Sequence, residues 1–488
     1  MEAPLLDTAS AGDSEPIRSL GELKSVICLE SVKVWKIAGP AVITILSQFG
    51  VYGINTMFVG HLGDIELASV SVSLNIVGTF SFGFMLGMGS ALETLCGQAY
   101  GAGQVHMLGI YMQRSWIVLL VSCFFILPIY IFATPILKFF GQVDQIADLA
   151  GTFTLQTIPQ LFSLAINFPC QKFLQAQSKV NVLASIAFSS LILHMAMLWL
   201  FIYQLGWGTT GAAVAFDISR WGIAVAEVVY IMVWCREAGW NGFSWLAFKD
   251  IWPFVRLSLA SALMLCLEIW YTTAVYLISG HLDNPVIAVG ALSICLNINN
   301  WQMMFFVGLN AAISVRVSNE LGRGHPRAAK HAVYVTIFES LLIGILCMVI
   351  IFITRNKFSI IYTSDEALQR AVSHLAYLLG ATMLLNSVQP VISGVAIGGG
   401  WQAMVAYINL GCYYIFGLPL GYLLSHVANL GVMGLWGGMI CGLALQTIFL
   451  LFVLFKTNWN KEVEQSSERM RKWGDQFIKN DQKSNENS

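Results

Sequence analysis

Long apolar stretches of about twenty residues alternate with short polar segments along most of the chain. A helix needs about 20 mostly apolar residues to cross the hydrocarbon core of a bilayer, so each stretch predicts one transmembrane helix. Twelve such spans are predicted, at residues 37–58, 67–88, 112–133, 147–170, 181–205, 211–233, 254–279, 286–313, 332–353, 371–394, 401–424 and 430–455.

The two halves of the chain repeat one another. Gly101-Ala102-Gly103 and Gly322-Arg323-Gly324 close the second span of each half, and the pairs Gly208/Gly211 and Gly431/Gly434 open the sixth. Because six spans bring the chain back to the starting side, the two repeats have the same orientation. We therefore predict an all-α polytopic membrane protein, with twelve transmembrane helices in two six-helix bundles related by a pseudo-two-fold axis along the membrane normal.

This repeat predicts the domain organisation. The first lobe, with spans one to six, covers residues 33–233, and the second, with spans seven to twelve, covers 254–455. The segment between them, 234–253, mixes aromatic and basic residues, as is typical of a linker lying at a membrane interface. Residues 1–32 and 456–488 are polar tails, with a short helix expected near 461–477.

Composition and charge agree with a membrane protein. The chain has 488 residues, of which 57% are hydrophobic and 11% charged, against about 25% charged in soluble domains. Of the 26 Lys and Arg residues, 21 fall on the side of the predicted topology that holds both termini, four fall on the other side, and Arg220 is intramembrane. The excess of basic residues on cytosolic loops places both termini in the cytosol.

Several function classes are excluded. A net charge of −1 gives no reason to expect a nucleic-acid partner. The ten Cys residues form no C-x-x-C pair, the eight His residues are dispersed, and G-x-x-x-x-G-K-[ST], H-E-x-x-H and G-x-S-x-G are missing. We expect no metal site, no cofactor other than H⁺ as coupling ion, and no enzymatic activity. An ion-driven secondary transporter that acts as a monomer in the bilayer is the simplest interpretation.

Glu268 is the strongest single candidate residue, because it lies inside the seventh predicted span. A charge near the bilayer centre costs about 2.5–3.5 kcal/mol, so a carboxyl group there is expected to mark an ion or substrate pathway and to take up a proton readily. The structural alternative is a carboxyl that only hydrogen-bonds neighbouring helices.

Further polar and aromatic residues in the second half are candidates for a substrate cavity. Interrupted or proline-bent helices often mark binding sites in transporters, although they also occur for packing alone. Polar amides of this kind equally tie membrane helices together, and aromatic side chains are common in lipid. The candidates are Asn297, Asn299, Asn300, Gln302, Asn386, Gln389, Trp270 and Tyr271.

In the first half, Gln48, Tyr52 and Asn55 fall on one helical face, and Gln160 follows Pro159 in the fourth span. We expect these four to line a cavity in the first bundle, with a polar helix contact as the alternative.

We interpret the other ionisable groups in and beside the spans as structural and not as transport residues. Asp217 and Arg220 are one turn apart and are expected to neutralise each other. Glu227 is expected to face lipid headgroups. Glu93 and Glu320, beside glycine-rich turns at the cytosolic ends of spans two and eight, are expected to be gate or capping residues.

The chain resembles the plant branch of the multidrug and toxic compound extrusion (MATE, or DETOXIFICATION) family. The resemblance covers about residues 30–460 and rests on SALETLCGQAYGAGQ (90–104), LQAQ (174–177), LCLEIW (265–270), SVRVSNELGRG (314–324) and QPVISGVAIGGGWQ (389–402). It implies antiport of organic solutes, coupled to protons or sodium, by rocking of two lobes. It also implies that Glu268 is the coupling carboxylate.

Two positions depart from the family pattern. Asn386 stands where many members have an aspartate in the tenth span, and Asn55 where bacterial members often have one in the first. This pattern resembles the flavonoid-related vacuolar subgroup and leaves Glu268 as the principal proton carrier. We therefore expect proton-coupled antiport of a small organic solute, such as a flavonoid glycoside, at the vacuolar membrane, with the plasma membrane as the other location considered.

Two alternatives remain open. The main alternative is a channel-like chloride conductance of the vacuolar membrane, because fewer titrating groups weaken tight coupling. A lipid-carrier flippase is less favoured, because no basic belt is visible for a pyrophosphate head. The acidic dileucine pattern Glu2-Ala3-Pro4-Leu5-Leu6 resembles a vacuolar or lysosomal sorting signal, but a solvated tail explains it equally well.

Overall fold

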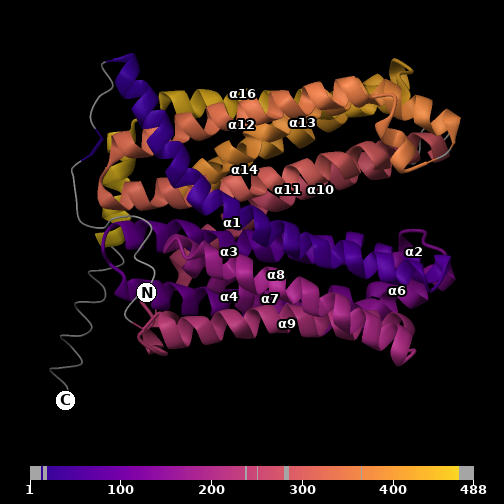
Figure 1. Ribbon diagram of the computed structural model, residues 1–488, viewed down its shortest axis with the longest axis horizontal. Helices are drawn as coiled ribbons and strands as arrows, with labels where there is room; N and C mark the ends of the chain where they lie inside the picture. The colour runs from indigo at the N-terminus through magenta and orange to yellow at the C-terminus, as the bar shows by residue number, and fades with distance from the viewer. Residues whose placement is uncertain are drawn as a thin grey trace. The chain divides into compact units, whose positions relative to one another are not determined.

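The computed structural model describes residues 13–14, 19–236, 239–249, 251–279, 285–363 and 365–471. Within these ranges the chain is almost entirely helical and contains no strand (Figure 1). The dileucine pattern lies outside the described residues. Packing divides the described helices into two compact units, which we call unit 1 (the described residues within 39–262 and 466–471) and unit 2 (those within 13–38 and 263–465).

Most helices of unit 1 are built from apolar runs. Its elements are the second part of α1 (Leu20–Gly60), α2 (Asp64–Val72), η1 (Ser73–Gly78), α3 (Thr79–Gly101), α4 (His106–Ile131), α5 (Ala133–Phe139), α6 (Asp144–Gln156), α7 (Ile158–Ala176), α8 (Val180–Leu198), η2 (Trp199–Gln204), α9 (Gly208–Trp234), η3 (Trp245–Phe248) and the start of α10 (Ile251–Ser279). The fourth predicted span is interrupted at Thr157, where α6 ends, and Pro159 stands in the first turn of α7. Proline suits a helix start because its missing N–H would have no partner there.

Unit 2 contains the second half of the sequence together with the start of α1. Its further elements are α11 (Pro285–Arg323), α12 (Pro326–Thr354), η4 (Phe358–Ile361), α13 (Glu366–Gly399), α14 (Gln402–Asn409), η5 (Leu410–Gly417), α15 (Leu418–Tyr422), η6 (Leu423–Val427) and α16 (Gly431–Lys456). The centre of this unit is α13, which packs against α11, α12 and α16. A further helix runs from residue 459 to 471, and the rest of the helix predicted at 461–477 lies outside the described residues.

Two helices are divided between the units. Residues 20–38 of α1 pack with unit 2 and residues 39–60 with unit 1, while α10 contributes residues 251–262 to unit 1 and 263–279 to unit 2. The predicted lobes begin instead at residues 33 and 254. The boundaries defined by packing therefore fall inside α1 and α10, whereas the boundaries predicted from hydropathy were set where polar segments meet apolar spans.

Nine helices in the described part of the chain are long and apolar enough to cross a membrane. The predicted spans that fall outside this set, at 147–170, 211–233 and 286–313, lie on α6 and α7, on α9 and on α11. The α6 helix has only 13 residues and ends before α7 begins, and α9 carries the charged residues Asp217, Arg220 and Glu227. The count of twelve spans therefore stays a prediction.

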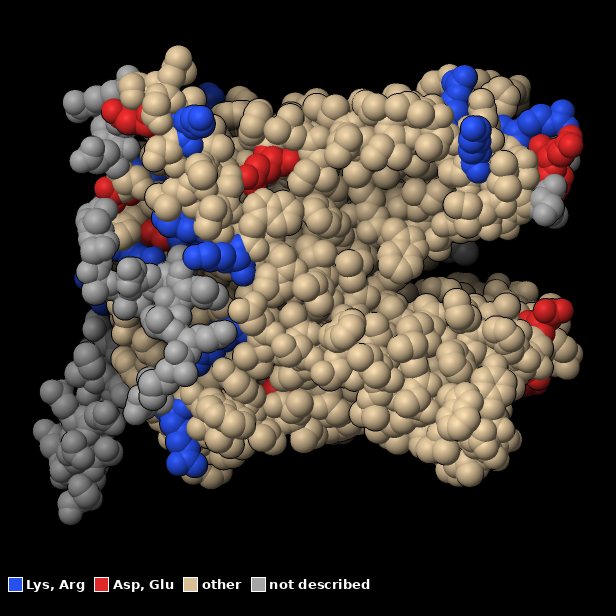
Figure 2. Space-filling view, in the orientation of Figure 1, with Lys and Arg blue, Asp and Glu red and all other residues tan. Residues whose placement is uncertain are grey.

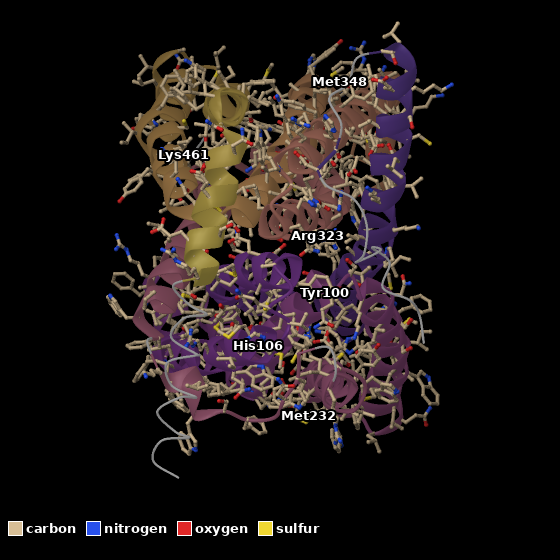
Figure 3. The ribbon with its side chains drawn as sticks, turned by 90° about the vertical axis from the view of Figure 1, so that its left-hand side faces the viewer. Tyr100, His106, Met232, Arg323, Met348 and Lys461 are labelled. Carbon is tan, nitrogen blue, oxygen red and sulfur yellow. The ribbon has the colours of Figure 1, made fainter. Side chains whose placement is uncertain are left out.

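Charged side chains gather at the ends of the helices, and the middle of each unit is almost entirely uncharged on the face shown in Figure 2. Figure 3 looks at the helix ends, with Tyr100 near the end of α3, His106 at the start of α4 and Arg323 at the end of α11. This distribution is typical of a protein whose helices span the hydrocarbon layer.

Candidate functional site

Glu268 lies on α10 in the part of the helix that belongs to unit 2, and its side chain is partly buried. The Gln389 amide of α13 and the buried ring of Tyr413 of η5 lie near the carboxyl group. The second carboxyl oxygen, Oε2, is buried without a hydrogen-bond partner among the described residues. A buried acceptor left unpaired costs free energy, so this oxygen is poised to bind a proton or another donor.

Gln389 stands directly before Pro390, which lies inside α13. Its side chain is buried, Nε2 donates to Ser393 Oγ at 3.1 Å, and Oε1 has no partner among the described residues. Proline has no N–H, so it cannot bond the carbonyl four residues earlier, that of Asn386. The helix is thus locally less saturated with hydrogen bonds beside the Glu268 carboxyl.

Two of the four predicted amides on α11 bond to α13. Asn386 Nδ2 donates to Asn299 Oδ1 at 3.1 Å, and Gln302 Nε2 donates to the Met383 carbonyl at 3.0 Å. Asn299 and Gln302 are buried, so this pair joins the two helices in the manner of interhelical glue.

The other predicted residues of unit 2 have different surroundings. Asn297 and Asn300 are exposed, and Asn297 Oδ1 accepts a hydrogen bond from Tyr362 Oη at 3.3 Å. Tyr271 is buried, stacks on Tyr413 with ring centroids 4.5 Å apart, and donates to the Met439 carbonyl. Trp270, the next residue towards the N-terminus, is exposed. Glu268 of α10 and Asn299 and Gln302 of α11 therefore lie next to α13, which carries Asn386 and Gln389. Tyr271 belongs to the packed core instead.

In unit 1, Tyr52 and Gln160 line a cavity about the size of one water molecule. Its other lining residues come from η1, α4, α6 and α9 and from the α6–α7 junction, and they are Ser73, Leu74, Val77, Gly78, Tyr130, Thr154, Thr157 and Phe216. Gln48 is partly buried, and its backbone carbonyl accepts from Arg220 Nη2 at 3.3 Å. Asn55 is fully buried, and in the described part of the chain neither its Oδ1 nor its Nδ2 has a hydrogen-bond partner.

The predicted neutralisation of Asp217 by Arg220 is wrong. No ion pair joins these two described residues: Asp217 Oδ1 accepts the backbone N–H of Gln160 at 3.0 Å, while Arg220 turns towards α1. One turn of separation brings two Cα atoms close, but each side chain follows its own tertiary contacts. The placement of Glu227 at lipid headgroups is also wrong, because this carboxyl is buried and accepts from Asn167 Nδ2 at 3.1 Å.

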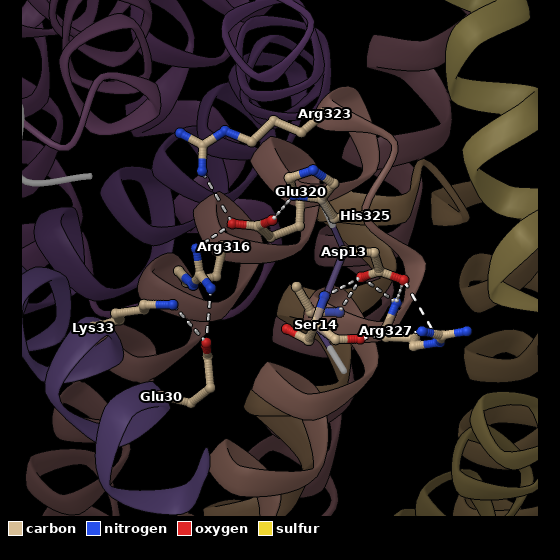
Figure 4. Close-up of polar contacts among 10 residues, drawn as sticks. Asp13, Ser14, Glu30, Lys33, Arg316, Glu320, Arg323, His325 and Arg327 are labelled. Carbon is tan, nitrogen blue, oxygen red and sulfur yellow. Dashed lines mark hydrogen bonds and ion pairs between the residues drawn. The ribbon is translucent and has the colours of Figure 1, made fainter. Parts of the chain in front are cut away.

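Glu93 and Glu320 each take part in buried ion pairs. Glu93 pairs with Lys172 at 2.6 Å in unit 1. In unit 2, Glu320 contacts Arg316, Arg323 and His325, at 2.5, 3.2 and 3.0 Å (Figure 4). Burial by itself would raise the pKa of Glu320, but the positive charges of Arg316 and Arg323 and the hydrogen bond with His325 lower that pKa below its ordinary range.

Sequence reasoning missed two carboxylates that the structure places in unit 2. Glu30 of α1 is buried and pairs with Arg316 at 2.8 Å. Glu339 lies within the apolar span at 332–353; Ser31 Oγ donates to its Oε1, while its Oε2 is buried without a partner. The argument that selected Glu268, a carboxylate within an apolar run, would also have selected Glu339. Among the described residues no group of three or more His, Cys, Asp or Glu side chains is arranged to hold a metal ion.

Comparison with known proteins gives consistent matches. The MatE family model matches residues 40–200 and 260–423. Protein DETOXIFICATION 35 of Arabidopsis thaliana is 66% identical over 474 residues, which cover 97% of this chain and 97% of the relative. Protein DETOXIFICATION 34 of the same plant is 60% identical over 468 residues, covering 96% and 86%.

Solved structures show the same fold. The crystal structure of the eukaryotic MATE transporter AtDTX14 aligns with a TM-score of 0.87 at 33% identity and covers 91% of this chain and 99% of that one. The crystal structure of the Vibrio cholerae MATE transporter VcmN in the bent form aligns with a TM-score of 0.76 at 16% identity, covering 91% and 99%, and shows likeness of fold alone.

Proposed function

Because the chain belongs to the MATE family of membrane transporters, we propose that it exchanges protons for small organic solutes across the vacuolar membrane by rocking-bundle alternating access. As a member of this family it is a transporter and not an enzyme. Glu268 carries the proton in this proposal, and the solute binds at the α11–α13 contact by replacing the hydrogen bond that Asn386 and Asn299 make with each other.

The proposal rests on the surroundings of the Glu268 carboxyl group, which make its protonated form favourable. This group is partly buried in a membrane helix, it has Gln389 beside it, and one of its oxygens is buried without a partner. An ionised carboxylate is costly in this setting, whereas a protonated one donates a hydrogen bond and carries no charge. Loading and releasing one proton therefore changes the free energy of unit 2 by an amount that depends on which side of the membrane the carboxyl faces.

The transport cycle uses this difference. On the acidic side Glu268 takes up a proton and its interaction with the Gln389 amide weakens, because that amide bonds the charged form more strongly. The packing of α10 against α13 then changes and the solute is displaced. On the cytosolic side the proton leaves and the charged form is restored. A ligand shifts such an equilibrium only by its difference in affinity for the two states, so proton and solute must favour opposite states.

The side chains of unit 2 support the proposed solute, and the proton gradient of the vacuole supports the proposed membrane. Amides at Asn299, Asn386 and Gln389 suit hydroxyl and carbonyl groups, and the exposed ring of Trp270 suits a flat aromatic solute such as a flavonoid glycoside. A vacuolar proton gradient points out of the lumen and supplies the driving force for loading solute into it. A fluorescent fusion to the full chain tests this location against the plasma membrane.

Flux in proteoliposomes with an imposed pH gradient tests the mechanism. We expect Glu268→Gln to abolish proton-dependent exchange and Glu268→Asp to retain part of it, because only the aspartate can titrate. Glu366→Gln is the matched control, since Glu366 is highly exposed at the start of α13. Exchange by Glu268→Gln at the parent rate would refute the proposal.

A second candidate, a channel-like conductance for chloride or similar anions, is favoured by one observation. Arg220 is a buried cation in α9 without an ion-pair partner among the described residues. Patch-clamp recording separates the two functions: large currents down an anion gradient without proton flux favour the channel, and proton-linked solute flux without such currents favours the antiporter.

A further inference from the structure

Arg220 lies in the interior of unit 1 and only 5% of its surface is exposed. An arginine inside a membrane-spanning helix costs about 2.5–3.5 kcal/mol at the bilayer centre, and such residues almost always pair with an opposite charge or line a water-filled cavity. Its positive charge therefore needs a counter-charge or water inside unit 1.

No carboxylate of the described chain is within ion-pair distance of Arg220. Its contacts are the Gln48 carbonyl, at 3.3 Å from Nη2, and the rings of Tyr52 and Phe216, whose centroids are 4.8 and 5.2 Å from Cζ. Asp217 is oriented towards the start of α7 instead, where it accepts from Gln160. Another of its donors, Nε, is buried and has no hydrogen-bond partner among the described residues.

Other buried groups around Arg220 also lack partners. The Phe216 ring contacts Tyr52 and His194, with centroids 5.2 and 6.3 Å apart, so these side chains surround the same ring as the guanidinium. His194 Nδ1 bonds Ser219 Oγ at 2.8 Å, whereas its Nε2 is buried without a geometrically defined hydrogen bond among the described residues. Asn55 lies one helical turn beyond Tyr52 on the same face of α1, and its Nδ2 and Oδ1 both lack a partner among the described residues. Two of the unpaired groups, Arg220 Nε and Asn55 Nδ2, are N–H donors.

We propose that Arg220, with Asn55 and the rings of Tyr52 and Phe216, forms a binding site for a small monovalent anion of the halide class. Such an ion accepts hydrogen bonds from Nε–H and the amide without needing a donor in return. It also balances the buried positive charge, and the positive edges of aromatic rings tolerate it.

The adjoining cavity sets the size of the ligand. Tyr52 and Phe216 belong both to the Arg220 surroundings and to the lining of the water-sized cavity, whose other walls include Ser73, Thr154 and Gln160. The lining of this cavity includes neither Arg220 nor Asn55, so the cavity lies beside the proposed site, and its small size favours a halide ion over the larger gluconate and sulfate. Asp217 lies one turn away, so its negative charge weakens anion binding whenever it is ionised.

This inference deepens the second candidate function, the anion pathway, but the site is tested by binding and not by transport. A negative binding result would therefore refute the anion site alone, and a negative transport result would refute the corresponding proposed function. The competing interpretation is that Arg220 is only a tether between α9 and α1, in which case anions do not bind to it.

The experiment measures thermal unfolding of the purified full chain in lipid nanodiscs, in sodium chloride, bromide, sulfate or gluconate at one ionic strength. A ligand that binds only the folded state raises the midpoint in a saturable manner. We expect chloride and bromide to raise the midpoint relative to gluconate, and sulfate to have no effect. Arg220→Gln should abolish the halide effect, Asn55→Ala should weaken it, and Asp217→Asn should lower the half-saturating chloride concentration.

Arg236→Gln is the matched control, because Arg236 is an exposed arginine just after α9, and it should retain the full halide effect. Equal midpoints of the parent chain in chloride and gluconate would overturn the proposal, as would a halide effect preserved in Arg220→Gln. If Arg220→Gln fails to fold, crystals of the parent grown in sodium bromide decide the matter. An anomalous bromide peak beside Arg220 Nε supports the site, and a featureless map there overturns it.

Discussion

Arg316 on α11 and Glu30 on α1 form an ion pair with 2.8 Å between Nη2 and Oε2, although 286 residues separate them in the chain. Both side chains are almost completely buried, and Arg316 also pairs with Glu320. The start of α1 is thereby bound to the end of α11 within unit 2, as Figure 4 shows. This network explains why residues 20–38 pack with the second half of the sequence.

The first prediction concerns this ion pair. Arg316→Ala leaves two buried carboxylates without their main counter-charge, and breaking a buried pair from one side costs about 3–5 kcal/mol. We expect a marked loss of thermal stability in detergent or nanodiscs. Lys33→Ala is the control, because Lys33 also pairs with Glu30 but is 32% exposed, and such pairs contribute about 0–1 kcal/mol. Similar losses for the two variants would contradict this account.

The second prediction follows from the lowered pKa of Glu320. A carboxyl group whose pKa is lower in the folded than in the unfolded state stabilises the fold at every pH above its ordinary pKa, which is 4.5 for Glu. This stabilisation is lost as the pH falls through the lower pKa of the folded state. Unfolding midpoints should therefore drop between about pH 5 and the folded pKa. Glu320→Gln should be less stable at neutral pH and should show a shallower drop. An unchanged pH profile in this variant would argue against the assignment.

The third prediction concerns the close approach of α13 to α11. A Cβ atom on Gly394 would lie 2.5 Å from the Asn310 carbonyl oxygen, and one on Gly398 would lie 2.7 Å from that of Ser314. These contacts are to backbone, so the helices must separate, at a cost of about 1–3 kcal/mol for each alanine. Both variants should unfold at lower temperature. Gly437→Ala in α16 has no atom within 4 Å of the added Cβ and should be neutral or slightly stabilising.

The fourth prediction tests the role of Asn386. Its amide bonds Asn299 at 3.1 Å in the same unit as Glu268. Asn386→Asp introduces a second group that can titrate near the proposed proton carrier. We expect more protons to be exchanged for each solute molecule in proteoliposomes, whereas Asn386→Ala should leave the ratio unchanged. An unaltered ratio in Asn386→Asp would place this position outside the coupling pathway.

Local sequence patterns were sufficient to predict the fold class. Apolar stretches long enough to cross a bilayer predict helices because a lipid core satisfies no backbone hydrogen bonds, and the all-helical fold of the described residues confirms this. Family membership was predictable from motifs such as SALETLCGQAYGAGQ, and the comparisons confirm it. Glu268 was selected by the same logic of solvation, and its role stays a prediction.

Only the tertiary structure decided which polar side chains meet. Spacing along α9 paired Asp217 with Arg220, but their contacts lie on α7 and α1, and Glu227 bonds Asn167 instead of facing headgroups. The links from Glu30 to Arg316 and from Ser31 to Glu339 each join residues about 300 positions apart. Hydropathy depends on each residue and its near neighbours, whereas an ion pair depends on where two distant helices cross. For this reason the sequence predicted the spans, and the fold alone decided the partners of their charges.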